Sequence, residues 1–565
     1  MHNYLTPFTY MDGVITHQQP YANVNQASVK QVPAANFTGV LAKWSWIVLL
    51  IAAFVQVLIF TTLPNVVAVA SVLLAWQIVK RIFLKKEMLE AFPLSSFLII
   101  GYASTQFYFP IIFTLIEGKP LVFNLDLPYD VFLHSTVTIV VLALAHYVYR
   151  SLPYKHGTQS NSWLVKAGLF NIPSDLQLWI MGFMGIGATF YVYLYTPDIG
   201  WEVTGSASDK AIQALMPFSY IPFFIPFGEM YGKDKPVGKS TVLLLIGYTL
   251  LLFLVSIGRN SRGGFMIGFT TLGFSYIMGL MLGKYKNKIF TVKNAMIAVF
   301  AGWLLTGPVA DIGTAMVLVR AHRMNIPYDE LIGLTLDAYG DKEAIRRYRL
   351  ADITSKHDWD ENYLDNILLA RFCNIKFNDA SLVQAARIGG QDPYMATFVE
   401  DYIWATLPQP FLDVFKINID KKMLKGVSMG DYLYYRAGGP KEALGGFRTG
   451  SMAGTGMATF GWWYMVFLGV GMIPVFLLFD LLYYKRKVQN PLTGTIYMQA
   501  TFSICGMLGL DAVFRYLPSE SVASIAIFLI RDFIQAIILY LVIYHGTRML
   551  NLLVRKRKPA LVTSN

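Results

Sequence analysis

Residues Val255 to Phe269 read VSIGRNSRGGFMIGF and place Arg259, Arg262 and a pair of glycines between two strongly apolar runs. Each run is close to the length of about 20 mostly apolar residues that a membrane-spanning helix requires. The stretch is therefore predicted to be a short turn between two spans. The fold depends on how often the rest of the chain repeats this pattern.

The composition is that of a membrane protein. The chain has 565 residues, of which 55% are hydrophobic and only 15% charged, and its mean hydropathy is +0.46. So little polar surface cannot coat a soluble protein of this size. The net charge of +12 does not indicate nucleic acid, because Lys and Arg lie in short clusters beside apolar segments rather than in one basic and aromatic patch. We expect membrane lipid around the chain and no nucleic-acid partner.

Twelve apolar runs are long enough to span a bilayer. They lie near residues 45–62, 65–83, 93–115, 131–149, 176–195, 211–230, 240–257, 264–283, 293–311, 456–483, 494–513 and 521–544. They predict an all-α fold of about twelve transmembrane helices. The predicted regions are a polar tail over 1–44 without a cleavable signal, nine spans over 45–311, a long hydrophilic segment over 312–455, three spans over 456–547 and a basic tail over 548–565.

The distribution of basic residues predicts which side each connection faces. Counted from an N-terminus inside the cell, six clusters fall on the inner side: 80–86, 150–166, 233–239, 284–293, 485–487 and 548–558. The opposite short loops hold only Lys119, Lys210, Arg259, Arg262 and Arg515. Because Lys and Arg accumulate on the cytoplasmic side, both termini are predicted inside, and Val255 to Phe269 is predicted outside. Amphipathic patterns in 312–455 predict a helical extracytoplasmic cap.

Arginines on the outer side run against the usual charge bias. Gly258 is suited to end one span, Ser261 to cap the next, and Gly263 and Gly264 leave the first amides of that helix open to close approach. A helix N-terminus attracts anions, and two guanidinium groups add paired donors that suit phosphate oxygens. The stretch therefore predicts a diphosphate site. The alternative is that both arginines extend to lipid headgroups at a helix end.

Other ionisable residues lie at membrane depth or at the outer ends of spans. Arg531 falls near the middle of the twelfth span, and Asp511 and Arg515 fall one turn apart at the outer end of the eleventh. Charged groups in lipid are costly, so these residues are expected to face the interior of the bundle or a water-filled cavity, where they are candidates for substrate binding. The alternative is structural: Asp511 with Arg515, or Asp532 with Arg531, pair to hold helices together. At the two ends of the long segment, further predicted site residues are Asp311, Arg320, His322, Arg323 and Arg448.

Two motifs, GRNSRGGF and GMATFGWWYMVFLGVGM, together with the arrangement of spans, resemble the Wzy-type O-antigen and exopolysaccharide repeat-unit polymerases, relatives of the O-antigen ligases. The resemblance covers roughly residues 40 to 550 in architecture. It implies a GT-C-like fold in the bacterial inner membrane and transfer of a polyprenyl-diphosphate-linked glycan to another lipid-linked repeat unit. The partners that the resemblance implies are a flippase and a chain-length regulator. By position, it also implies that Arg259 and Arg262 bind the diphosphate.

The departing diphosphate gains negative charge, so arginines placed beside it lower the barrier without a metal or another cofactor. The attacking hydroxyl still requires a base. The ligase relatives often place a histidine at the end of the long loop, where this chain reads FRTGSMAGTG instead. The expected base is His322, followed by Asp311.

KHDWDENY, with His357, Asp358, Asp360 and Glu361, is interpreted as a solvated acidic turn rather than a cation site or a sugar-nucleotide motif, since nucleotide sugars are cytoplasmic and this stretch is predicted outside. A second class of function is a lipid-linked oligosaccharide flippase or another twelve-helix transporter. Such transporters usually show related halves, and the asymmetric long segment argues against them. A third is a membrane acyltransferase that modifies glycans, with His134 or His146 as its histidine.

Overall fold

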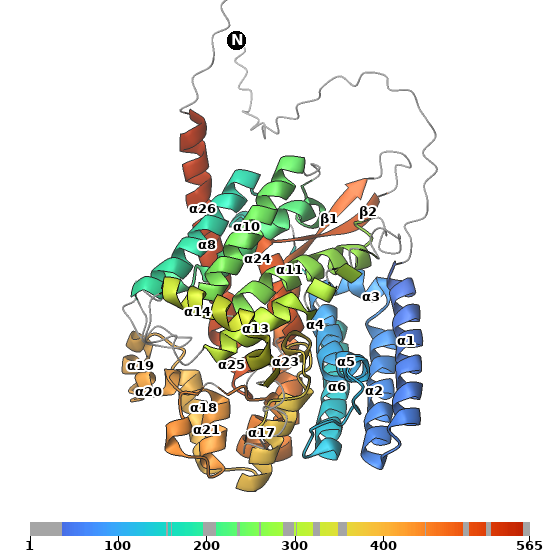
Figure 1. Ribbon diagram of the computed structural model, residues 1–565. Helices are drawn as coiled ribbons and strands as arrows, with labels where there is room; N and C mark the ends of the chain where they lie inside the picture. The colour runs from blue at the N-terminus through green and yellow to red at the C-terminus, as the bar shows by residue number, and fades with distance from the viewer. Residues whose placement is uncertain are drawn as a thin grey trace, which may run out of the picture. The chain divides into compact units, whose positions relative to one another are not determined.

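The computed structural model describes the chain from Phe37 onward with gaps. The described residues are 37–153, 156–159, 161–195, 211–233, 238–258, 262–285, 296, 299–300, 302–304, 306–319, 328–347, 359–446, 448–489, 496–515 and 521–556. Over these residues the protein is mostly helical, and a single pair of strands is the only sheet they form. Figure 1 shows the order of the elements by colour.

The first helices form a bundle with a few buried polar side chains. Its elements are α1 (Phe37–Ile59), α2 (Leu63–Ile82), α3 (Lys86–Ala91), α4 (Pro93–Ala103), η1 (Ser104–Tyr108), α5 (Phe109–Ile116) and α6 (Pro128–Ser151). Pro93 is the first residue of α4, where a missing N–H costs nothing. Pro110 follows the π-helical turn η1 inside the continuous helix Pro93–Ile116. Gln56 of α1 is fully buried, and its side-chain amide donates to the Thr114 hydroxyl over 3.2 Å and to the Lys119 carbonyl over 3.0 Å. These bonds tie α1 to α5 and to the loop that follows α5.

A second group of helices follows the connection after α6, which is predicted to face the cytoplasm. This connection contains α7 (Trp163–Lys166). The group comprises α8 (Asp175–Tyr195), the 3-10 helix η2 (Met216–Met230), α10 (Lys239–Gly258) and α11 (Arg262–Met281). α8 and η2 pack closely because Gly182 and Gly185 leave no side chain between them: an added Cβ would lie 2.2 Å from Pro222 Cγ and 2.1 Å from the Ser219 backbone nitrogen. Pro222 and Pro226 cannot donate to an α-helical ladder, which favours the tighter 3-10 winding.

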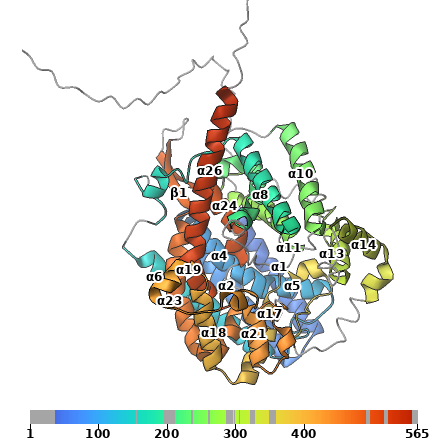
Figure 2. The same cartoon turned by 90° about the vertical axis from the view of Figure 1, so that its left-hand side faces the viewer.

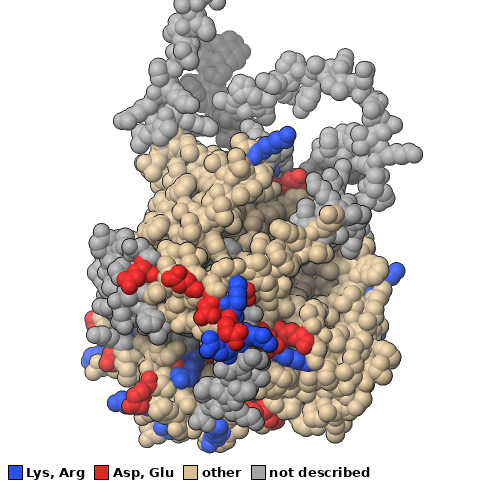
Figure 3. Space-filling model, viewed as in Figure 1, with Lys and Arg blue, Asp and Glu red and all other residues tan. Residues whose placement is uncertain are grey.

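The long hydrophilic segment folds into short helices that pack on the ends of the spans. Its elements are α13 (Pro308–Leu318), α14 (Tyr328–Gly340), α16 (Ile367–Ala370), α17 (Ile375–Ile388), α18 (Pro393–Trp404), α19 (Gln409–Phe415), α20 (Lys421–Lys425), α21 (Met429–Arg436) and η4 (Lys441–Ala443). α17 packs against α6, α21 and α22 (Met452–Phe460), and α14 packs against α10 and α13. Figure 3 shows acidic and basic side chains gathered over the level of α13 and α14, below an almost uncharged surface over α10 and α11.

The last part of the chain returns to the spans. It comprises η5 (Gly461–Trp463), α23 (Tyr464–Asp480), β1 (Tyr483–Gln489), β2 (Ile496–Phe502), α24 (Ile504–Arg515), α25 (Ser524–Ile527), η6 (Phe528–Asp532) and α26 (Phe533–Lys556). α23 packs against α6 and α4, α24 against α4 and α11, and α26 against α8. Figure 2 shows α26 as one long helix beside α8 and α24.

One predicted span is wrong in its secondary structure. The run 494–513 was expected to be one helix, but β1 and β2 form an antiparallel hairpin in which Tyr483 is paired with Phe502 and Gln489 with Ile496. Only Ile504–Arg515 of that run is helical, so the expectation of an all-α chain also fails at this hairpin. The physical reason is that β1 supplies partners for the backbone of Ile496–Phe502, so those residues satisfy their hydrogen bonds between strands.

Eight helices of the described residues are long and apolar enough to cross a membrane. They are Phe37–Ile59, Leu63–Ile82, Pro93–Ile116, Pro128–Ser151, Ala211–Met230, Lys239–Ile257, Met452–Asp480 and Ser524–Asn551. Ile267–Met281 and Ile504–Phe514 are apolar but shorter. A multi-pass membrane protein is therefore confirmed. The number twelve stays a prediction.

Candidate functional site

The loop between α5 and α6 is bonded to the long hydrophilic segment through charged side chains. Lys119 Nζ lies 2.6 Å from Asp365 Oδ1 and 2.9 Å from Glu117 Oε2. Glu117 in turn accepts from the backbone N–H groups of Asp365 and Asn366, over 2.9 and 3.0 Å. A charged loop at the end of two spans therefore fixes the start of α16.

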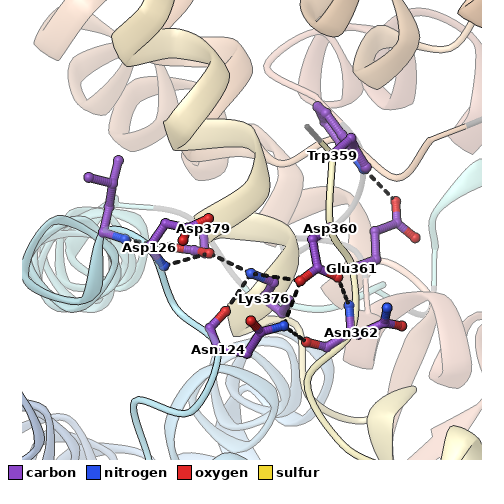
Figure 4. A network of polar contacts seen from close by, with 9 residues as sticks. Asn124, Asp126, Trp359, Asp360, Glu361, Asn362, Lys376 and Asp379 are labelled. Atoms are coloured by element: carbon purple, nitrogen blue, oxygen red, sulfur yellow. Dashed lines mark hydrogen bonds and ion pairs between the residues drawn. The ribbon is translucent and has the colours of Figure 1, made fainter. Parts of the chain in front are cut away.

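Next to it lies a group of polar residues that we call the junction cluster: Asn124, Asp360, Glu361, Lys376 and Asp379 (Figure 4). Lys376 and Asp379 are three residues apart on α17, a spacing that places both side chains on one face of the helix. Their side chains are 2% and 0% exposed, and Lys376 Nζ lies 2.8 Å from Asp379 Oδ2. Such a buried charge pair is stable only if its remaining bonds are satisfied.

Loop residues satisfy most of these bonds. Asp379 accepts from the backbone N–H of Asp126 over 3.1 Å and of Leu127 over 2.8 Å, while Lys376 also donates to the Asn124 carbonyl. Burial raises the pKa of Asp379, and the Lys376 ammonium opposes that rise. Two parts therefore form one electrostatic unit: the loop that precedes α6, and the helix α17.

Asp360 completes the unit from the other side. Its Oδ2 accepts from Asn124 Nδ2 over 2.6 Å and lies 3.8 Å from Lys376 Nζ, and its Oδ1 accepts from the Asn362 N–H over 2.8 Å. Asn124 has a left-handed backbone with φ of 54°, a conformation that asparagine tolerates better than most residues. That conformation lets its side chain bridge Asp360 and the Asn362 carbonyl.

Glu361 is the titratable group of the cluster best suited to chemistry. Its Oε1 accepts from Trp359 Nε1 and from the Thr449 N–H, each over 2.9 Å. Among the described residues no hydrogen bond ends on its other oxygen, Oε2. Burial raises the pKa of Glu361, while these two bonds and the nearby charges of Arg371 and Arg448 oppose the rise. The carboxyl group is therefore desolvated, while the residue as a whole is half-buried.

Arg448 was predicted from the sequence and lies beside Glu361. Its Nη1 contacts Asp431 Oδ1 over 3.0 Å and the Ala443 carbonyl over 2.7 Å, and its guanidinium lies 4.6 Å from the centre of the Tyr434 ring. Asp431 is fully buried and also forms a capping box with Ser428 at the start of α21. The side chain of Arg448 is 26% exposed, so this arginine is held in place but not enclosed.

Asp311 lies on a neighbouring element. It stands in the first turn of α13, and its Oδ2 lies 2.9 Å from Lys342 Nζ. Five residues earlier, the Thr306 carbonyl accepts from the side chain of Asn366 over 2.8 Å. The start of α13 is therefore attached to the residues that follow Glu361. An ion pair with a lysine makes Asp311 a weaker candidate for the base than Glu361.

The predicted turn between α10 and α11 is confirmed in its helix limits. α10 ends at Gly258, and Arg262, Gly263 and Gly264 are the first three residues of α11. α10 packs on α14, and α14 packs on α13, which carries Asp311. Arg259, Ser261, Arg320, His322 and Arg323 lie outside the described residues.

The residues predicted at membrane depth are divided between two environments. Asp511 is buried on α24 and accepts from the Thr270 hydroxyl of α11 over 2.6 Å, so it joins two helices. Arg515 is the last residue of α24. Arg531 lies in η6, and its Nε is 2.8 Å from Oδ1 of the adjacent Asp532, so the two residues pair as the structural alternative expects, but within one element rather than between helices.

One interpretation of the sequence is wrong. The acidic turn of KHDWDENY was expected to be solvated, but Asp360 and Glu361 are partly buried and bonded to Asn124 and Thr449. Asn124 lies 236 residues away from Asp360 in the chain, so no local pattern could have indicated the contact. His357 and Asp358 lie outside the described residues.

The two histidines considered for an acyltransferase are engaged inside the protein. His134 is buried, its Nδ1 lies 2.8 Å from the Tyr464 hydroxyl, and its ring stacks on Trp462 at 4.2 Å. His146 is fully buried, with Nε2 3.1 Å from the Ser95 hydroxyl. Ser95 and Tyr149 both donate to the fully buried Asp480, over 2.6 and 2.9 Å. This second polar group joins α4, α6 and α23.

The fold and the site together define a class: a multi-pass membrane protein with a folded hydrophilic segment attached to the ends of its spans through a buried charged cluster. Comparison with protein-family models, with curated proteins and with solved structures found no match for this chain.

Proposed function

We propose that this protein is a polysaccharide polymerase, a membrane glycosyltransferase that joins lipid-linked repeat units at the outer face of the bacterial inner membrane. The donor is a glycan on a polyprenyl diphosphate, and the acceptor is the non-reducing sugar of another lipid-linked unit. The observation that carries the proposal is Glu361: a desolvated carboxyl group beside Arg448, whose Oε2 accepts no hydrogen bond from the described residues, where the hydrophilic segment meets the spans.

Glu361 replaces His322 and Asp311 as the proposed base. Its Oε2 takes the proton of the acceptor hydroxyl as that oxygen forms a bond to the anomeric carbon. The bond from the anomeric carbon to the diphosphate oxygen breaks, and the lipid diphosphate leaves with the bonding electrons. A carboxyl group whose pKa is raised toward neutrality is a stronger base than an ordinary glutamate.

The departing diphosphate requires cations. Arg262 begins α11, and the first amides of a helix favour an anion. Arg259 and Arg262 are proposed to bind the diphosphate, with Arg448 on the sugar side of the bond that breaks. Preorganised donors of this kind act mainly on the transition state.

The decisive experiment compares lipid extracts from cells that lack the chain with extracts from cells that carry Glu361→Gln or Arg262→Ala. We expect each to accumulate lipid with a single repeat unit on the outer leaflet and to make no polymer. Glu343→Gln and Arg346→Ala, at exposed positions beyond α14, are the matched controls and should leave polymer unchanged. Wild-type polymer from well-expressed Glu361→Gln would reject the base. A single unit trapped on the inner leaflet would identify a flippase instead.

A further inference from the structure

α19 and α20 carry large apolar side chains on the surface of the hydrophilic segment. Phe411, Val414 and Phe415 of α19 are 56%, 76% and 61% exposed, and Met423 of α20 is 52% exposed. Three large side chains on one seven-residue helix exceed the scattered apolar exposure of an ordinary protein surface.

The exposed side chains share one face. Phe411, Val414 and Phe415 follow spacings of three and four, which bring them to one side of α19. Leu412 faces the other way and is fully buried, and Leu424 of α20 is buried as well. The two helices are therefore fixed to the segment through Leu412 and Leu424, and their exposed side chains lie on the opposite side. Figure 1 shows α19 and α20 at the edge of the segment near α18.

The buried side of this pair contacts the start of a span. Leu424 belongs to one core cluster with Phe398, Val399, Met429, Ala523 and Ile527. Ile527 lies within the apolar helix Ser524–Asn551, and Ala523 directly precedes it. The exposed apolar face is therefore attached to the point where a long apolar helix begins and must enter the bilayer.

The charges around this face suit phosphate. The stretch Gln409–Lys425 contains Lys416, Lys421, Lys422 and Lys425 against Asp413 and Asp420. Lys416 is exposed and ends α19 with a left-handed backbone, φ 55°. Lysines that flank an apolar face are typical of segments that lie in the lipid headgroup region. A second copy of the same face would bring like charges together.

We propose that α19 and α20 form an interfacial membrane anchor, in which Phe411, Val414, Phe415 and Met423 insert among the acyl chains of the leaflet where Ser524–Asn551 begins. Lys416, whose side chain is exposed, then lies at the level of the lipid phosphates. The anchor holds the hydrophilic segment against the membrane, and it does not depend on the proposed enzymatic function.

The test uses the full chain in nanodiscs of phosphatidylcholine mixed with phosphatidylglycerol. A nitroxide is attached to Phe415→Cys or Val414→Cys, and unsubstituted protein is the background because Cys373 and Cys505 are both buried. Collision with oxygen, which concentrates in lipid, is compared with collision with a water-soluble nickel chelate. We expect both positions to favour oxygen and to lie about 5–10 Å below the headgroup boundary.

Glu442→Cys, at an exposed acidic position of the same segment, is the control and should favour the nickel chelate. Nickel accessibility at Phe415 equal to that at Glu442 would overturn the proposal. So would spin–spin broadening between labels, since it would assign the face to a second copy. A Phe411→Ser, Phe415→Ser pair should move a label at Val414 toward water while the spans keep the protein in the membrane.

Discussion

Glu361 shows how a single carboxyl group acquires chemistry from its surroundings. Burial favours its neutral form, whereas Trp359, Thr449 and the two nearby arginines favour the ionised form. The pKa rises because desolvation outweighs the sum of the others. Asp379 has a similar environment, but its partner Lys376 lies 2.8 Å away and engages the carboxylate. Asp379 is therefore a structural carboxylate, whereas Oε2 of Glu361 accepts no hydrogen bond from the described residues.

The raised pKa of Glu361 predicts a pH dependence of polymer synthesis. The base must be ionised, so the rate should fall as the pH is lowered through the raised pKa, with a midpoint above that of an ordinary glutamate. For stability the sign is opposite: the contribution of the protonated group is fully present below the unfolded pKa and is lost as the pH rises through the folded pKa. Glu361→Gln should therefore abolish synthesis but melt at the same or a higher temperature at neutral pH.

The measurement is the initial rate of chain extension by reconstituted protein against pH, with a thermal melt of each variant. A rate midpoint at or below the ordinary glutamate value would contradict the assignment. So would a large fall in melting temperature for Glu361→Gln at neutral pH, because that result would indicate a structural carboxylate.

At the scale of elements, the contact between α17 and α22 depends on one missing side chain. A Cβ added at Gly454 of α22 would lie 2.2 Å from Ser381 Cβ and 2.7 Å from the Ser381 carbonyl oxygen on α17. Atoms that close must move, and backbone cannot move without disturbing α17, which carries Lys376 and Asp379. The glycine therefore sets the position of the junction cluster.

We predict that Gly454→Ala lowers the melting temperature, with a loss of about 1–3 kcal/mol typical of overpacking. Gly333→Ala on α14 is the matched control, since nothing lies within 4 Å of its added Cβ. Alanine favours helix there by about 1 kcal/mol, so the control should be neutral or stabilising. Equal melting temperatures for the two variants would show that α17 and α22 are not in close contact.

The sequence predicted the helix limits well where a turn signal was local. Gly258 and Arg262 are the end of α10 and the start of α11, as expected from Gly258 as the last residue of one span and Ser261 as the cap of the next. It failed at Ile496–Phe502, which lies in the apolar run 494–513: hydrophobicity alone does not distinguish a buried strand from part of a helix. Among the site residues, Arg448 was found from its place before a span. Asn124 and Lys376 were missed because only the folded chain brings them to Asp360.

At the scale of the whole molecule, two positions of the chain face the same side of the membrane only if an even number of helices crosses it between them. Between Lys86 and Glu343, four of the helices long enough to span lie in the chain. α8, α11 and the apolar stretch that ends with α13 are the further predicted crossings. If all three also cross, the number is odd and the two positions face opposite sides.

We predict that Glu343→Cys reacts with an impermeant maleimide added outside, in intact inner membranes reached through a permeabilised outer barrier. Lys86→Cys, whose native side chain is 54% exposed, should react only after lysis. If both cysteines react from the same side, the number of crossings between them is even. The hydrophilic segment would then not lie on the side of the membrane opposite to Lys86.

Hydrogen bonds join helix α17 to the loop that precedes α6. These bonds also constrain the order in which the protein assembles during synthesis. Asp126 and Asp379 are 253 residues apart, and a ribosome that adds ~5–20 residues per second leaves roughly 13–50 s between them. During that interval the early spans already occupy the bilayer while Asn124 and its neighbours lack their final partners. The first helices must therefore assemble while polar groups of the loop before α6 still lack their partners. The hydrophilic segment, which is synthesised later, then stabilises the arrangement of these first helices.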